Sequence, residues 1–161
     1  MSAYRNRPDV ALDDYLRCSY TFAYGMNMSA ATMDANYRLV GPAYLTGWGL
    51  EFDRFANVVR AGSRVPGVVW EILSVSGLRY LDQREGYHPG EEGGYYTREV
   101  LKVDMPWDEV ETWVYHMRPE ARNPVQQPCA DWYYATMAAG REAVGLPTDD
   151  LPLRQAVDSR M

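Results

Sequence analysis

The stretch Thr21-Phe-Ala-Tyr-Gly-Met-Asn-Met28 decides the expected fold, because apolar residues run into a glycine and an Ala-rich segment follows. This order predicts a strand, a tight turn and a helix over residues 29–36. Gly25 lets the backbone approach a ligand closely, and the unpaired amide groups of a helix N-terminus attract negative charge. The turn is therefore a candidate seat for a carboxylate or an oxyanion, although most turns of this kind bind nothing.

The second informative stretch is Leu81-Asp-Gln-Arg-Glu-Gly86. The leucine spacing predicts a helix over 75–83, with Glu85 in its last turn or at the edge of the following loop. A carboxyl group at the negative end of a helix dipole holds its proton more tightly than in water, which suits a general acid/base. A solvated glutamate at a helix end is the alternative. Asp82 is expected to be structural or solvated, and a carboxylate pair with Glu85 remains open.

The remaining sequence predicts more strands than helices. Short runs bearing Val, Tyr or Trp and bounded by Gly and Pro predict strands, and an Asp start with a Gly-Leu-Pro stop predicts a late helix over 131–144. The expected strands are 18–23, 43–52, 66–73, 95–103 and 112–117. Because strands and helices do not alternate regularly, the sequence favours an α+β fold over a doubly wound sheet.

Motifs in a fixed order resemble the gamma-glutamylcyclotransferase family, and the resemblance covers nearly everything from Cys18 to Leu151. In that family the first motif usually reads Tyr-Gly-Ser-Asn, whereas Met26 stands at the serine position here. The Leu-Asp-x-x-Glu-Gly motif is intact. The motifs are Phe22-Ala-Tyr-Gly-Met-Asn-Met28, Gly41-Pro-Ala-Tyr-Leu-Thr-Gly-Trp-Gly-Leu-Glu-Phe52, Gly67-Val-Val-Trp-Glu-Ile72, Leu81-Asp-Gln-Arg-Glu-Gly86 and Ala139-Gly-Arg-Glu-Ala-Val-Gly-Leu-Pro147.

The resemblance implies a small, curved, mixed β-barrel with flanking helices, and an enzyme that releases 5-oxoproline from gamma-glutamyl amines or amino acids. In this reaction the substrate's own α-amine attacks its γ-carbonyl and expels the amine, so the enzyme needs no nucleophile, metal or cofactor. Glu85 matches the family's catalytic acid/base, which takes the ammonium proton and returns it to the leaving nitrogen. We expect partial burial to raise its pKa toward the working pH.

The resemblance also implies which residues bind the gamma-glutamyl substrate. Main-chain recognition would explain why Met26 is tolerated, although methionine loses a hydroxyl and adds bulk. From the residues alone, Asn27 is better explained as the N-cap of the helix over 29–36. Tyr115 lies in a strand-like run whose residues alternate between two faces, one of which could pack on the core while the other lines a cleft. The alternative is that Tyr115 is one more half-buried aromatic residue of a strand. The implied substrate-binding residues are Thr21, Phe22, Ala23, Tyr24, Gly25, Met26, Asn27 and Tyr115.

The composition fits one compact domain. At 161 residues and 47% hydrophobic residues, the chain can bury a core without disulfides. We expect a single domain over 18–161 and an N-terminal extension over 1–17, whose apolar spacing predicts a short amphipathic helix that packs on the domain or on a partner. A net charge of −6 argues against nucleic acids and anionic membranes as main partners, because neither is attracted to a negative field.

Metal chemistry and membrane insertion are not expected. Cys18 and Cys129 lack metal or redox spacing, and His88 and His116 form no ligand cluster. The first twenty residues are polar, and no apolar run approaches about 18 residues, so neither a signal peptide nor a membrane span is predicted. The expected location is the cytoplasm, as a monomer or homodimer. The loop over 87–94 is either a lid over the cleft or an ordinary strand connection.

Three functional hypotheses remain open. The first is a cyclotransferase acting on a gamma-glutamyl amine or amino acid, with intact glutathione less favoured because the glutathione-specific branch has a different motif at the turn. The second is a pathway-specific enzyme that removes a gamma-glutamyl group from a biosynthetic intermediate. The third is a binding module of the same fold that has lost turnover through Met26.

Overall fold

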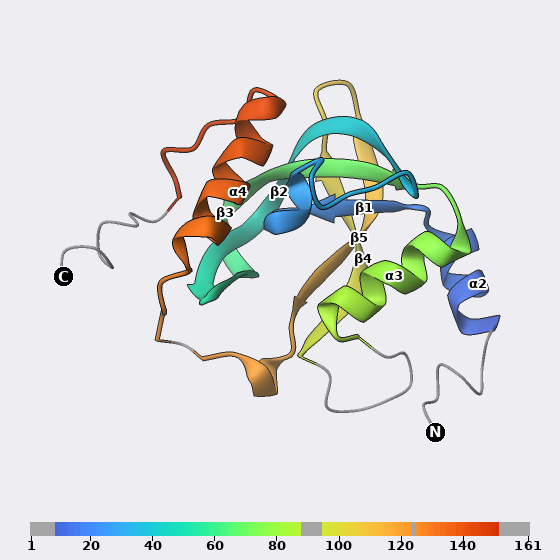
Figure 1. Ribbon diagram of the computed structural model, residues 1–161, viewed down its shortest axis with the longest axis horizontal. Helices are drawn as coiled ribbons and strands as arrows, with labels where there is room; N and C mark the ends of the chain where they lie inside the picture. Colours follow the sequence, from blue (N-terminus) through green and yellow to red (C-terminus); the bar gives the residue numbers. More distant parts are fainter. Residues whose placement is uncertain (1–8, 88–94, 124, 152–161) are drawn as a thin grey trace.

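Five strands close into a barrel in the computed structural model, which describes residues 9–87, 95–123 and 125–151 (Figure 1). Around the barrel the order is β1-β3-β2-β4-β5. Neighbouring strands are antiparallel except β1 and β5, which pair in parallel at Thr21 and Trp113 and so complete the circle. The α+β class and the mixed barrel are confirmed. The strands are β1 (Tyr20–Ala23), β2 (Tyr37–Asp53), β3 (Phe55–Ile72), β4 (Tyr96–Asp104) and β5 (Glu109–Met117).

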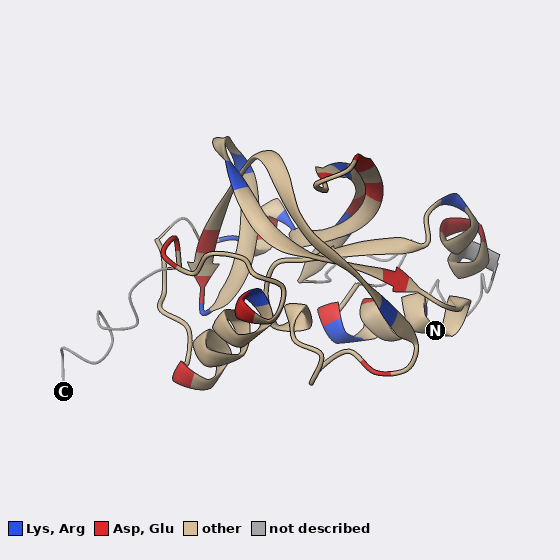
Figure 2. Ribbon diagram, turned by 90° about the horizontal axis from the view of Figure 1, so that it is seen from above, with Lys and Arg blue, Asp and Glu red and all other residues tan. Residues whose placement is uncertain are grey.

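Three α-helices in the described part of the chain flank the barrel. In Figure 1, α2 and α3 lie together on one side and α4 lies on the other. The predicted helices over 75–83 and 131–144 are confirmed as α3 and α4. Each of the three helices carries both acidic and basic residues (Figure 2). Their bounds are α2 (Asp9–Arg17), α3 (Val75–Glu85) and α4 (Asp131–Ala143), and single 3-10 turns occur at η1 (Met26–Met28) and η2 (Pro119–Ala121).

The predicted helix over 29–36 is wrong. The 3-10 turn η1 ends at Met28, and residues 29–36 form turns that lead from it to β2. Short polar side chains form hydrogen bonds with nearby backbone groups. Thr32 Oγ1 donates to the carbonyl of Met26 at 2.9 Å, and the Asp34 carboxylate accepts a hydrogen bond from the amide of Asn36 at 2.9 Å. Such side-chain bonds compete with the helical hydrogen-bond pattern and favour turns.

The hairpin of β2 and β3 is much longer than predicted. The strand expectations began at 43 and 66, whereas β2 starts at Tyr37 and β3 at Phe55. The glycines of this segment do not end the strands. The pairing register instead shifts between Leu39 and Gly41 and again between Thr46 and Trp48, and the hairpin continues past both places. Gly41 has φ 151°, in the range that favours glycine, so the strand bends there and continues.

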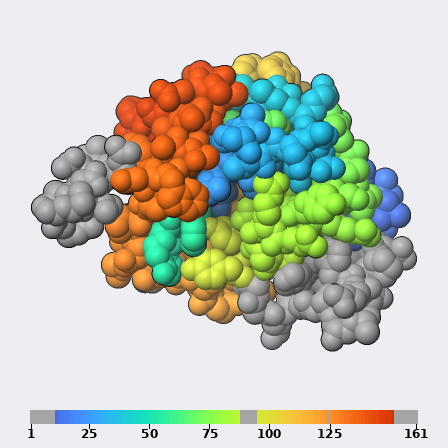
Figure 3. Space-filling model, viewed as in Figure 1, coloured from blue at the N-terminus to red at the C-terminus, as the bar shows by residue number. Residues whose placement is uncertain are grey.

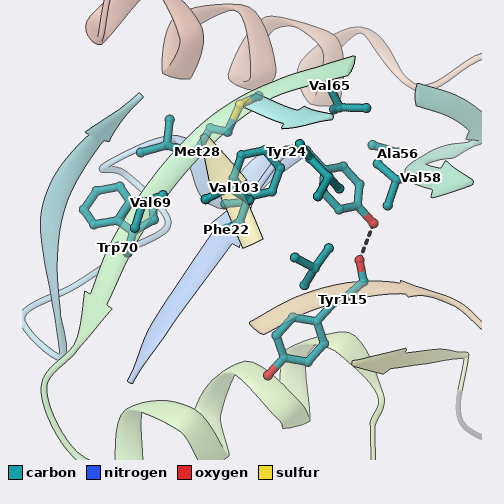
Figure 4. Close-up of a cluster of buried hydrophobic side chains, with 14 of the residues drawn as sticks. Phe22, Tyr24, Met28, Ala56, Val58, Val65, Val69, Trp70, Val103 and Tyr115 are labelled. Carbon is teal, nitrogen blue, oxygen red and sulfur yellow. Dashed lines mark hydrogen bonds between the residues drawn. The ribbon is translucent and has the colours of Figure 1, made fainter. Parts of the chain in front are cut away.

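The core fills the inside of the barrel. Inward-facing side chains from all the strands are almost fully buried, and Figure 4 shows part of this cluster. Gly140 on α4 lies so close to Met28 that a Cβ there would be 2.7 Å from the Met28 Cβ, which seats α4 directly on η1. The barrel therefore holds the turn after β1 between itself and α4. Core residues include Phe22, Val58, Val65, Val69, Val103 and Val114.

The helix α2 packs against α3 and forms an ion pair with the barrel. Ala11 is fully buried, and the Asp14 carboxylate pairs with Arg98 of β4 at 2.9 Å. None of the described helices has the length and apolarity needed to cross a bilayer. The lid hypothesis for the 87–94 loop concerns residues 88–94, which lie outside the described part of the chain.

Candidate functional site

A pocket of about 450 Å³ opens where the turn after β1, the end of α3, the start of β4, the tip of the β2–β3 hairpin and α4 meet (Figure 3). Its volume lies in the range of small-molecule sites, about 300–1,000 Å³. Every residue to which the sequence assigned a catalytic or substrate-binding role lines this pocket. These residues are Thr21, Phe22, Ala23, Tyr24, Gly25, Met26, Asn27, Glu85 and Tyr115.

Glu85 is the last residue of α3, as the sequence predicted. Gly86 ends the helix in the left-handed conformation, with φ 67°, and turns the chain away so that the glutamate faces the pocket. Burial raises the pKa of Glu85 from 4.5 to about 7, and the nearby negative charge of Asp82 adds to this effect while Arg84 opposes it. Near neutral pH, therefore, this carboxyl group can both accept and donate a proton.

Asn27 binds Glu85 and is not a helix cap. Its side-chain Nδ2 donates to Glu85 Oε1 at 3.2 Å, whereas Gly25 occupies the cap position of η1 without a side-chain hydrogen bond. The preferred capping prediction is wrong because the helix that Asn27 would cap does not form. Arg84 Nη1 donates to Asn27 Oδ1 at 3.4 Å and to the Thr32 carbonyl at 2.6 Å, which orients the amide with its nitrogen toward Glu85.

Asp82 is structural, and it positions Tyr115. The Asp82 carboxylate is 1% exposed and accepts hydrogen bonds from Arg98 Nε at 2.8 Å and from the Tyr115 hydroxyl at 2.6 Å. It does not share a hydrogen bond with Glu85, and it acts on that residue through its charge. Tyr115 is thereby held across the gap between β5 and α3.

Tyr24 closes the inner side of the pocket. Its hydroxyl donates to the main-chain carbonyl of Tyr115 at 2.5 Å, while the Tyr115 ring points the other way, toward α3 (Figure 4). Burial raises the pKa of Tyr24 well above its ordinary value, so the hydroxyl stays protonated. The turn after β1 is thus attached directly to β5.

Four aromatic residues of the pocket, Phe55, Tyr95, Tyr96 and Tyr133, were not found from the sequence. Tyr96 donates its hydroxyl to the Ala56 carbonyl at 2.8 Å, and the Ala56 amide donates to the Tyr133 hydroxyl at 2.9 Å. Phe55 lies next to them at the start of β3, with its ring 5.7 Å from that of Tyr133. Packing alone explains each of these residues locally, so no sequence signal marked them as pocket residues.

Thiols and acids in the described chain do not gather into a metal site. No group of three or more His, Cys, Asp or Glu within residues 9–87, 95–123 and 125–151 is placed to hold an ion. Cys18 donates its thiol to the carbonyl of Glu111 at 3.3 Å, and Cys129 is likewise buried and free.

A family model described as "Gamma-glutamyl cyclotransferase, AIG2-like" matches residues 21–134, well over half of the chain. The chain belongs to this family. The segment that matches the gamma-glutamyl cyclotransferase model begins at the first residue of the pocket and includes both Glu85 and Tyr115. No curated protein matches the sequence.

Three solved structures share the fold. A structure titled "Gamma-glutamyl cyclotransferase" aligns with a TM-score of 0.68 and 22% identity, covering 87% of this chain and 86% of its own. The uncharacterized protein loc79017 from Homo sapiens aligns with a TM-score of 0.68 and 23% identity over the same shares. YkqA from Bacillus subtilis aligns with a TM-score of 0.71 and 21% identity, covering 96% of this chain and 58% of its own.

Proposed function

We propose that this family member is an enzyme that releases 5-oxoproline from a gamma-glutamyl amine or amino acid, with Glu85 as the general acid/base. The observation that carries the proposal is the Glu85 carboxyl group, which has a pKa of about 7 and faces the same pocket as the turn after β1. A general acid/base works best when its pKa is close to the working pH.

The proposed reaction needs one proton carrier. Glu85 takes a proton from the substrate's α-ammonium group, and the freed amine attacks the γ-carbonyl carbon to form a five-membered ring. The bond from that carbon to the leaving nitrogen then breaks as Glu85 returns the proton to that nitrogen. The products are 5-oxoproline and the amine in its ammonium form, which also carries the second proton that the attacking nitrogen loses as the lactam forms. Holding the substrate folded for this attack can contribute on the order of 7–11 kcal/mol.

The turn after β1 supplies the other requirement, which is to hold negative charge. Gly25 is the cap residue of the 3-10 turn η1 and Met26 is its first residue, so their amide groups have no acceptor within that turn. Amide groups placed in this way stabilise an oxyanion or bind a carboxylate. Met26 keeps the amide that the family's serine would provide, and its side chain packs against the core. The departure from the family motif is therefore compatible with backbone recognition.

The variant Glu85→Gln tests the proposal. We expect it to fold and to release no detectable 5-oxoproline from gamma-glutamyl compounds, measured by mass spectrometry. Glu109→Gln makes the same chemical change at an exposed site on β5, outside the pocket, and should keep full activity. Near-normal turnover by folded Glu85→Gln would remove Glu85 from this role.

A panel of gamma-glutamyl compounds separates the remaining hypotheses. Release from simple dipeptides supports a general cyclotransferase, and release from a single elaborate amine supports a pathway-specific enzyme. Binding without release supports a module that has lost turnover.

A further inference from the structure

Aromatic rings line the mouth of the pocket, and they take no part in the proposed proton transfers. Phe55 and Tyr95 are 44% and 38% exposed, yet both line the pocket. The Phe55 ring lies 5.7 Å from Tyr133, and the Tyr95 ring lies 5.8 Å from Tyr96. We call Phe55, Tyr95, Tyr96 and Tyr133 the aromatic wall. Exposed apolar rings that border a pocket indicate a ligand contact.

The aromatic wall is held rigidly. The peptide groups of Ala56 fix two of its members, since the Ala56 amide donates to the Tyr133 hydroxyl and the Ala56 carbonyl accepts from Tyr96. The hairpin tip that carries Phe55 is tied to Gln127, whose carbonyl accepts the Arg54 amide at 3.0 Å. Rings ordered before binding lose little conformational entropy when a ligand arrives.

The charges at this end of the pocket do not suit a carboxylate. Arg84 is the one cationic side chain among the described residues that line the pocket, and its guanidinium already donates to the Thr32 carbonyl at 2.6 Å. Asp53, two residues before Phe55, has a buried Oδ1 that accepts no hydrogen bond and lies 4.0 Å from Nε of the exposed Arg54. Burial is the main cause that raises the pKa of Tyr96, and the charges of Glu85 and Asp53 add to it. A ligand group beside the aromatic wall therefore meets a negative field.

The size of the pocket leaves room for more than the gamma-glutamyl group. A volume of about 450 Å³ is that of a site for drug-sized ligands, whereas the acyl group that becomes 5-oxoproline has only five carbon atoms. The turn after β1 and Glu85 account for this acyl group. The leaving group accounts for the remaining space, which the aromatic wall borders.

We infer that the leaving group is a primary amine that carries an aromatic or similarly bulky apolar group and no carboxylate, and that this group packs on the aromatic wall. The inference rests on the proposed function and narrows its substrate class. It makes Phe55 and Tyr95 residues that determine specificity, separate from the acid/base Glu85.

The test compares gamma-glutamylphenethylamide with gamma-glutamylethylamide and gamma-glutamylphenylalanine. We expect kcat/KM for the phenethylamide to exceed that for the ethylamide by roughly 10–100-fold, and to exceed that for the phenylalanine compound, which adds a carboxylate. In Phe55→Ala the ratio of phenethylamide to ethylamide should fall at least about fivefold. Trp107→Ala removes another exposed ring, outside the pocket, and should leave this ratio unchanged.

A binding measurement separates this inference from the proposed function. Calorimetric titration of Glu85→Gln with the two amides measures the same preference without turnover. If the natural protein forms no 5-oxoproline but Glu85→Gln binds the phenethylamide about tenfold more tightly, the proposed reaction fails and the ligand class stands. Equal kcat/KM or equal affinity for the two amides overturns the inference. The inference is also overturned if the two amides bind with equal affinity and the natural protein is a dimer that Phe55→Ala dissociates. The aromatic wall would then be the contact with a second copy of the chain.

Discussion

The side-chain amide of Asn27 donates a hydrogen bond to Glu85 Oε1 at 3.2 Å and so joins the turn after β1 to the last residue of α3. A donor to a carboxylate favours its charged form, whereas burial favours the protonated form. In this pocket burial is the larger effect, and the pKa of Glu85 is raised to about 7. By this rule we expect the Asn27 donor to hold the Glu85 pKa below the value that burial would give without it.

Replacing Asn27 should shift the pH dependence of activity. A hydrogen bond to a charged group is worth roughly 1.5 kcal/mol, which corresponds to about one pKa unit. In Asn27→Ala the Glu85 pKa should rise. In a plot of kcat/KM for 5-oxoproline release against pH, the acidic limb, which lies near pH 7 for the natural protein, should therefore move up by about one pH unit. Activity should recover at higher pH. Asn123→Ala, at an exposed site, is the control, and an unmoved limb in Asn27→Ala would contradict the role of this contact.

Glu85→Gln should stabilise the protein at alkaline pH. Because folding raises the Glu85 pKa from 4.5 to about 7, the folded state binds more protons in this window and stability falls as pH rises through it. The neutral amide avoids this cost, so urea denaturation at pH 8 should give a free energy of unfolding about 1–3 kcal/mol higher than natural. The difference should vanish near pH 4, where the carboxyl is protonated in both states. A less stable variant at pH 8 would show that Glu85 is not destabilised by burial.

Asp82→Ala should destabilise the fold strongly. The change leaves the buried Arg98 without its closest partner and frees the Tyr115 hydroxyl. Removing one side of a buried ion pair typically costs about 3–5 kcal/mol, and the remaining Asp14 contact favours the lower end. The exposed Arg38 and Glu71 pair offers a control, because Glu71→Ala should cost less than about 1 kcal/mol. Equal losses in urea denaturation of the two variants would contradict this account.

Gly140→Ala should push α4 away from η1. The new Cβ would lie 2.7 Å from the Met28 Cβ and 2.9 Å from the Met28 carbonyl carbon, so the backbone itself must shift. Overpacking of this kind costs about 1–3 kcal/mol, which exceeds the helix-propensity gain of about 1 kcal/mol. Thermal unfolding should show a lower midpoint, and 5-oxoproline release should fall because η1 carries Asn27. Gly62→Ala meets no atom within 4 Å and should leave both quantities nearly unchanged.

The sequence predicted correctly those elements whose conformation is set by residues within the same segment. The helix α3 has its Ser74 N-cap and Gly86 C-cap within its own segment, and Gly145, with φ 78°, follows the end of α4, so the positions of both helices agree with the prediction within two residues at each end. The Leu-Asp-x-x-Glu-Gly motif placed Glu85 at a helix end for the same reason. The hairpin of β2 and β3 is longer than predicted because pairing with the partner strand stabilises its bulges. The sequence pattern of one strand does not show this pairing.

The sequence by itself determined the family motifs, the strand, turn and acid that form the candidate site, and the α+β class. Only the tertiary structure decided that Asn27 binds Glu85, that Asp82 holds Arg98 and Tyr115, and that Ala56 fixes two tyrosines at the mouth of the pocket. The physical reason is distance along the chain. The Asn27 and Glu85 pair spans 58 residues and the Ala56 and Tyr133 pair spans 77, so barrel closure, rather than any local preference, brings these groups together.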